Sequence, residues 1–174
     1  MSRPGLGRQA IGPAVRGLCQ SRAVRQPSIF EFAGGEQAFL ALATAHHERC
    51  VQDPVLNHPF SHPGKPDHVQ RLASYWAEVF GGPPRYTQSC GDQSAVLGIH
   101  AGTGAEDDLG ERFVGCFVRA ADDAGLPADA EFRAVLRSYM EWAVAQVMAC
   151  SPQGSQVPPG LRVPRWSWDG LQPE

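Results

Sequence analysis

A break made of two glycines and two prolines, residues 81–84, divides two helical segments in the middle of the chain. Before the break, residues 68–80 place apolar side chains at helical spacing, and after a polar turn residues 95–99 form a short apolar run. Neither helix can continue through the break, because proline lacks an amide proton and glycine is a poor helix former. The first segment begins at His68 and the second ends at His100. Two histidines thus bracket a helix, a rigid break and a second helix. This arrangement can hold a flat molecule between two imidazole rings.

The rest of the chain has the same three- and four-residue spacing of apolar side chains, and no alternating pattern indicates a strand. Ser28 is expected to cap the first helix, and Gly34 and Gly125 are expected to end helices. The predicted helices beyond the central stretch lie at about residues 29–33, 36–52, 107–124 and 129–150. The predicted fold class is all-α, with six or seven helices.

Composition divides the chain into three parts. Residues 1–27 hold five arginines and no acidic residue, without a sustained apolar period, so we predict a disordered basic tail. An organelle transit peptide is an alternative interpretation of this tail. Residues 28–150 are predicted to form one domain, followed by an extension rich in proline and tryptophan at residues 151–174. Trp166 and Trp168 are expected to pack on the helices or on a second subunit, because two tryptophans are unusual in a disordered tail.

Charge, hydropathy and cysteine content narrow the class of protein. The net charge of −3 gives no reason to expect a nucleic-acid partner, and no apolar run is long enough to predict a membrane span. The five cysteines are odd in number, form no Cys-x-x-Cys pair and follow no secretory signal, which predicts a reduced, cytoplasmic protein. Cys50, Cys116 and Cys150 fall in helical patterns and are expected to be small core residues.

The six histidines allow several kinds of site. His58 and His62 are expected in a loop; with His46 or His68 they could bind zinc, but no carboxylate or cysteine pair accompanies them. A hydrolase is disfavoured because no Gly-x-Ser-x-Gly turn is present, and a glycine-rich phosphate loop is also missing. His100 is different because it ends an apolar helix, where a buried imidazole needs a partner. Haem iron is a partner of this kind.

Several motifs together resemble the truncated haemoglobins, and group II in particular. They are Phe39 after Gly34-Gly35, Asp53-x-Val55-Leu56, Phe80-Gly81-Gly82-Pro83 followed by Tyr86-Thr87, and His100-Ala101 at a helix end. The resemblance covers about residues 28–150. It implies a two-over-two helical sandwich around non-covalent haem b, with His100 as the iron ligand. The absence of Cys-x-x-Cys-His agrees with a haem that is not covalently attached.

The resemblance also implies which side chains line the haem pocket. Phe60 matches the aromatic residue stacked on the porphyrin, and His68 matches the distal position, with Leu72 one turn further along the same face. His47 stands where the family usually has tyrosine, and Phe113 stands where group II usually has tryptophan. The expected haem-binding residues are Phe60, His68, Leu72, Trp76, Tyr86, His100 and Phe113.

The departures from the family pattern shift the expected chemistry. Phenylalanine cannot donate a hydrogen bond, so stabilisation of a bound ligand is expected to fall to His68 or His47. One of these two histidines binding the iron directly is an alternative. Ile99 replaces a basic residue that often pairs with a haem propionate. Lys65, Arg71, Arg85 or Tyr86 could take the place of that basic residue as the partner of the propionate.

The resemblance implies reversible binding of O2 or another diatomic gas, NO or CO, by a monomer or homodimer. An enzyme, either an NO dioxygenase or a peroxidase, is the first alternative. It would need an external reductase, because no flavin or nicotinamide motif is present. The second alternative is a haemless helical interaction module, in which the histidines are ordinary core and loop residues.

Overall fold

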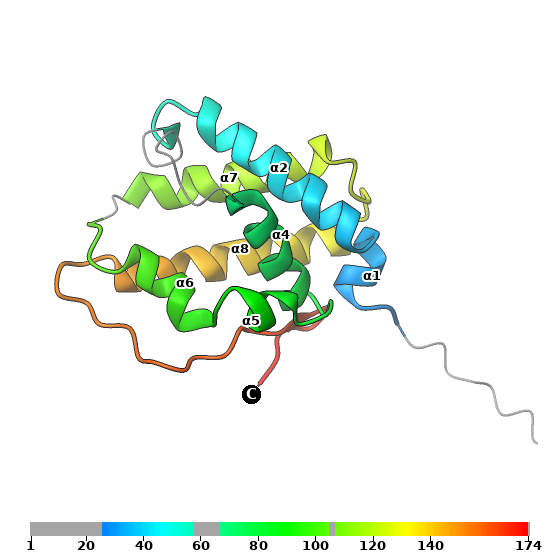
Figure 1. Cartoon of the computed structure of the whole chain (residues 1–174). Helices are drawn as coiled ribbons and strands as arrows, with labels where there is room; N and C mark the ends of the chain where they lie inside the picture. Colours follow the sequence, from blue (N-terminus) through cyan, green and yellow to red (C-terminus); the bar gives the residue numbers. More distant parts are fainter. Residues whose placement is uncertain (1–25, 58–66, 105–106, 174) are drawn as a thin grey trace, which may run out of the picture.

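The structure, a computed structural model, describes residues 26–57, 67–104 and 107–173 of the 174-residue chain. Figure 1 shows its helices in chain order. They are α1 (Ile29–Ala33), α2 (Glu36–Gln52), α4 (His68–Val79), α5 (Arg85–Ser89), α6 (Gln93–His100), α7 (Asp107–Asp123) and α8 (Ala130–Cys150). Two short strands follow, β1 (Trp166–Ser167) and β2 (Gly170–Leu171). The predicted N-terminal tail up to residue 25 lies outside the described residues, as do His58, Phe60, His62 and Lys65.

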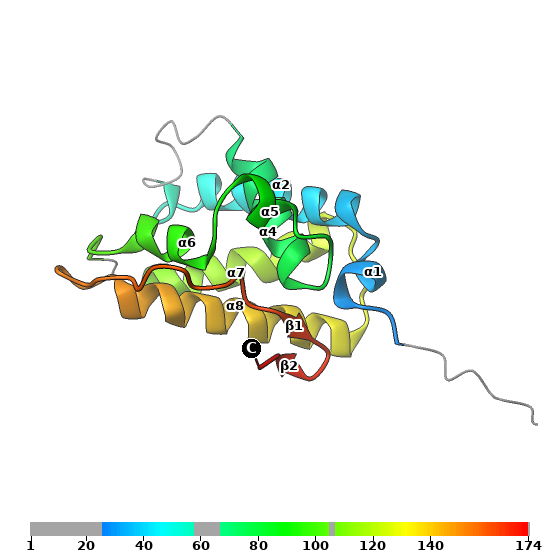
Figure 2. The same cartoon turned by 60° about the horizontal axis from the view of Figure 1, so that its bottom comes forward.

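Four helices form two layers. Helix α2 packs against α4 and α7, and α7 packs against α8, so that α2 and α4 cover α7 and α8. Figure 2 shows the two layers from the side, with α6 beside α8 at the end of the molecule opposite α1. Aromatic and aliphatic side chains fill the space between the layers. Those fully buried include Phe39, Leu42, Phe80, Phe117, Phe132, Leu136 and Tyr139. The predicted all-α, two-over-two fold is confirmed.

Local sequence signals fix both ends of α1 and the start of α8. The Ser28 hydroxyl accepts from the Glu31 amide, and the Glu31 carboxylate accepts from the Ser28 amide, which forms a capping box. Gly34 ends α1 in the left-handed conformation, with φ of 109°. At the start of α8, the side chain of Asp129 caps the helix by accepting from the Phe132 amide at 2.9 Å.

The glycine-proline break folds the end of α4 against α1. The Phe30 amide donates to the Phe80 carbonyl at 3.0 Å, and the Gly82 amide donates to the Ala77 carbonyl at 2.8 Å. A Cβ atom at Gly82 would lie 2.6 Å from the Ala77 carbonyl oxygen and 2.8 Å from the Phe30 ring. Only glycine fits this position without displacement of its neighbours.

Part of the stretch after the break, predicted to be a polar turn, is a short helix. Helix α5 has five residues and a mainly polar sequence, so it shows no apolar periodicity. It is held instead by the buried carboxylate of Glu78, which accepts hydrogen bonds from both the amide and the hydroxyl of Thr87. This pair ties the start of α5 to the end of α4.

The C-terminal extension packs on the helices, as predicted, but the expectation of no strands was wrong. β1 and β2 form an antiparallel ladder in which Trp166 pairs with Leu171. The Trp166 ring is buried, with its centroid 5.6 Å from Tyr139 and 5.5 Å from Trp142. Trp168 donates from its indole nitrogen to the Pro27 carbonyl at 2.7 Å. The extension therefore connects α8 with the start of the helical body.

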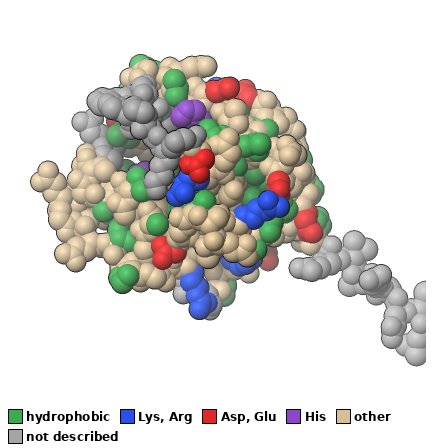
Figure 3. All heavy atoms as spheres, in the orientation of Figure 1, with side chains coloured by type: hydrophobic (Ala, Val, Ile, Leu, Met, Phe, Trp, Pro, Cys, Tyr) green, Lys and Arg blue, Asp and Glu red, His purple; other side chains and the backbone are tan. Residues whose placement is uncertain are grey.

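Three further expectations can be compared with the described residues. Cys50 and Cys116 are fully buried, as predicted, whereas Cys150 is only partly buried. No helix in this part of the chain is long and apolar enough to cross a membrane. On the face shown in Figure 3, acidic and basic side chains are interspersed, and neither sign forms a large patch.

Candidate functional site

The structure brings together the two histidines that were expected to contact a bound ligand. His47 lies on α2 and His68 is the first residue of α4, and their ring centroids are 5.6 Å apart. The pKa of His68 is lowered by loss of water around its ring and by the nearby charges of His47 and Arg71. At neutral pH, His68 therefore carries one N–H donor and one lone pair. Side by side, the two rings can present two nitrogen donors to a small polar ligand.

His46, the neighbour of His47, has a different environment and faces the core. Its ring is fully buried, with centroids 4.4 Å from Phe113, 5.4 Å from Trp76 and 5.8 Å from Phe117. Burial first, and then the charges of the neighbouring histidines, lower the pKa of His46 to about 3. The ring is therefore neutral, and its Nδ1 lies 3.5 Å from the thiol sulfur of Cys50. The sequence left open which of these histidines faces the core, and the structure assigns that place to His46.

His100 is the last residue of α6, on a helix that packs against α8. It is partly buried, and burial alone lowers the pKa of its ring. Among the described residues no side chain or backbone group forms a hydrogen bond with the His100 ring. A neutral imidazole that has lost water without gaining a polar partner is suited to coordinate a metal ion through its lone pair.

The other predicted pocket residues fall into two groups. Leu72 and Phe113 are partly buried, and Phe113 packs against the His46 ring. Trp76 and Tyr86 are buried more deeply: Trp76 contacts His46 and Phe117, and the Tyr86 ring meets Tyr75 edge-on at 5.1 Å. Haem contact by these four side chains remains a prediction. With or without haem, Trp76 packs between α2 and α7.

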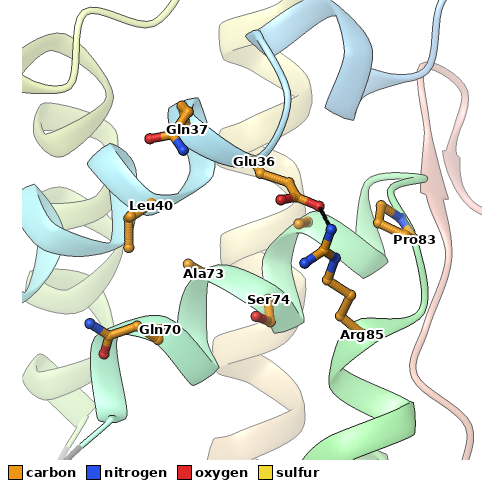
Figure 4. A pocket seen from close by; sticks show the side chains of 9 residues that line it. Glu36, Gln37, Leu40, Gln70, Ala73, Ser74, Pro83 and Arg85 are labelled. Carbon is orange, nitrogen blue, oxygen red and sulfur yellow. Dashed lines mark ion pairs between the residues drawn. The ribbon is translucent and has the colours of Figure 1, made fainter.

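Arg71 and Arg85, two of the expected partners of a haem propionate, have different surroundings. The Arg71 guanidinium lies over the Tyr86 ring, 5.9 Å from its centroid. Arg85 instead forms an ion pair with Glu36 at 2.7 Å. Figure 4 shows this pair at a pocket of about 170 Å³ between α2 and α4. None of the histidines in the described part of the chain lines this pocket, so it is separate from the site formed by His47 and His68. Of the two arginines, Arg71 is the better candidate for an anionic group near His68.

The sequence profile of the bacterial-like globin family matches residues 28–147, which include every helix from α1 to α7 and most of α8. The chain belongs to the bacterial-like globins. No curated protein matches the sequence. The family implies a haem cofactor. The lowered pKa of His100 and the absence of a hydrogen-bonding partner for its ring among the described residues fit that implication.

Solved haemoglobin structures resemble this globin over nearly their whole length. The haemoglobin of Thermobifida fusca is 27% identical, with a TM-score of 0.57, and the match covers 70% of this chain and 96% of that one. The haemoglobin of Chloroflexus aurantiacus is 24% identical, with a TM-score of 0.61, and covers 74% of this chain and 100% of that one. A group II two-on-two haemoglobin of Agrobacterium tumefaciens is 20% identical, with a TM-score of 0.62, and the match covers 75% of this chain and 98% of that one. The last two matches show the fold alone.

Two features of this globin's site were not predicted from the sequence. One is the contact between His46 and the Cys50 thiol, a pair at positions i and i+4 of α2 that helical spacing could have indicated. The other is the buried Gln93 at the start of α6, whose side-chain oxygen accepts from the Tyr75 hydroxyl at 2.6 Å. This bond crosses from α4 to α6 and no local sequence signal predicts it.

Proposed function

We propose that this globin binds haem b without a covalent link, with His100 as the iron ligand, and that it reversibly binds O2 or another diatomic gas. The observation that supports the proposal best is the environment of His100. Its ring has lost water and has no hydrogen-bonding partner among the described residues, and its pKa is lowered, so it is neutral at pH 7. Bound haem would supply an iron that His100 could coordinate and that could take up a small ligand.

The residues on α2 and α4 would set how tightly a ligand is held. His47 and His68 can each donate an N–H to a polar diatomic ligand, whereas Phe113 can exclude water but donates nothing. A single hydrogen bond of this kind contributes roughly 1–1.5 kcal/mol, equivalent to about a tenfold change in affinity. With two adjacent donors, we expect one histidine to hold the ligand and the other to orient its ring.

The proposal is tested by titrating the purified protein with hemin and then measuring CO and O2 binding to the reduced form. A Soret band that saturates at one hemin per chain supports the proposal. A protein that takes up no hemin would favour a haemless interaction module. The spectrum of the reduced protein also distinguishes a five-coordinate iron from one in which His47 or His68 occupies the sixth position.

The distal assignment is tested by replacing His47 and His68 with leucine, singly and together. We expect the double variant to release O2 about tenfold faster than the wild type, because both donors are lost. Gln70→Leu is a matched control, since Gln70 is an exposed residue of α4 that lines the separate pocket in Figure 4. Unchanged O2 release in the double variant would exclude both histidines as donors.

A further inference from the structure

The start of α6, the helix that carries His100, is hydrogen-bonded to a segment about 65 residues further along the chain. The Ser94 hydroxyl donates to the Pro158 carbonyl at 2.7 Å and accepts from the Leu161 amide at 2.9 Å. The Gln93 amide donates to the Leu161 carbonyl at 3.0 Å. Three bonds therefore fix the first turn of α6 to residues 158–161.

The chain just beyond α6 is fixed to the same C-terminal segment. The Gly102 amide donates to the Cys150 carbonyl at 3.1 Å, and the Gly104 amide donates to the Ser151 carbonyl at 2.9 Å. The segment that follows α8 therefore passes the His100 end of α6 first and the Ser94 end second. It runs antiparallel to α6 and holds both ends of that helix.

Residues 151–173, which we call the C-terminal strap, are anchored again at their far end. Trp166 is buried against Tyr139 and Trp142, and Trp168 bonds to the Pro27 carbonyl and meets the Phe32 ring edge-on at 5.0 Å. Figure 2 shows the strap running from the end of α8 past α6 to β1 and β2. The family match ends at residue 147, so the strap lies outside the part of the chain that defines the family.

Helix α6 also packs against α8 and accepts one hydrogen bond from Tyr75 of α4, but most of its side chains are not buried. It has eight residues, of which only Gln93 and Leu97 are buried, and Ile99 next to His100 is 67% exposed. A helix this short is not stable on its own in water and takes its position from tertiary contacts. For α6 the strap supplies three of these contacts, as hydrogen bonds to the first turn of the helix.

We propose that the C-terminal strap positions α6, and with it His100, relative to the bound cofactor. This inference rests on the proposed function. Ser94 is the positioning residue in it, because one hydroxyl forms two of the three bonds at the start of the helix. With the strap attached, the His100 ring keeps one position and one orientation relative to the helices that surround it. With the Ser94 bonds removed, α6 can move, and the imidazole holds the iron less firmly.

The test compares full-length wild-type protein with Ser94→Ala, and uses Ser89→Ala as a matched control. Ser89 is exposed, and among the described residues its hydroxyl bonds locally, to the Arg85 carbonyl at 2.6 Å and to the Cys90 sulfur at 3.6 Å. In Ser94→Ala we expect haem transfer to an excess of apomyoglobin to become about five- to tenfold faster, the effect of losing one to two hydrogen bonds. We also expect a shift or broadening of the iron–histidine stretching band in the resonance Raman spectrum of the reduced protein. The control should match the wild type in both.

Hydrogen–deuterium exchange separates positioning of α6 from a general loss of stability. In Ser94→Ala, amides of residues 95–100 should exchange faster while those of α7 keep the wild-type rate. Wild-type exchange in residues 95–100 together with an unchanged iron–histidine band would overturn the proposal. If Ser94→Ala does not fold, Trp168→Phe provides a second comparison, since it replaces the indole by a smaller ring and removes the bond to Pro27 that anchors the far end of the strap. If the wild type takes up no hemin, the proposed function fails, and the exchange rates alone decide whether the strap holds α6.

Discussion

Replacement of His46 by phenylalanine should make the protein less sensitive to acid. His46 is fully buried between aromatic rings of α4 and α7, and the polar group that its Nδ1 meets among the described residues is the Cys50 thiol. Burial raises the pKa of that thiol, so Cys50 stays uncharged and cannot stabilise an imidazolium ion. His47 and His68 on the adjoining surface oppose the charge as well. The folded protein therefore keeps His46 neutral over a pH range in which the unfolded chain protonates it.

The size of the effect follows from the two pKa values of the ring, 6.5 in the unfolded chain and about 3 in the folded protein. Below pH 6.5 the unfolded state binds one more proton than the folded state, so the free energy of unfolding decreases as the pH falls. The contribution is fully present above pH 6.5 and is lost progressively down to about pH 3, with a total of about 5 kcal/mol. Between pH 7 and pH 5 the expected loss from this single residue is about 2 kcal/mol.

Urea unfolding followed by circular dichroism at pH 7 and pH 5, at equal haem loading, measures this contribution. Wild type should lose about 2 kcal/mol more than His46→Phe between the two pH values. Gln70→Leu is the control, because it changes an exposed side chain of α4 and leaves the histidines in place. Equal pH dependence of the wild type and His46→Phe would show that the buried ring is not the acid-sensitive group.

Two further substitutions test the packing described above. Gly82→Ala should lower the free energy of unfolding by about 2 kcal/mol, because the new Cβ would lie 2.6 Å from a backbone carbonyl oxygen; a loss below roughly 0.5 kcal/mol in urea unfolding would contradict this geometry. Trp166→Ala should cost about 3 kcal/mol, since it removes a buried ring from between Tyr139 and Trp142. A wild-type thermal midpoint for this variant would show that the ring does not pack there in solution.

The helices that could be predicted are those whose apolar side chains repeat at helical spacing and whose ends carry a local signal. α1 and α2 match the prediction residue for residue, with Ser28 and Gly34 as the signals for α1. α5 could not be predicted, because its stability comes from Glu78 in the preceding helix rather than from its own sequence. The ladder between β1 and β2 has two residues on each side, too few for an alternating pattern to appear.

For the candidate site, the sequence indicated the residue types better than their surroundings. Adjacent positions on a helix are about 100° apart, so either His46 or His47 could have faced the core. Contacts with Trp76 and Phe113, which lie on other helices, decide the question in favour of His46. The attachment of α6 to the strap depends on bonds between residues more than 60 positions apart, and these leave no pattern in a single sequence.

The most direct test of the account is whether His100 is the iron ligand. His100→Gly should leave a cavity in place of the imidazole, so that the reduced variant loses the wild-type Soret spectrum or fails to retain hemin. Free imidazole added to the variant should occupy that cavity and restore the wild-type spectrum and CO binding. An unchanged spectrum in His100→Gly without imidazole would contradict the account, because another residue would then hold the iron.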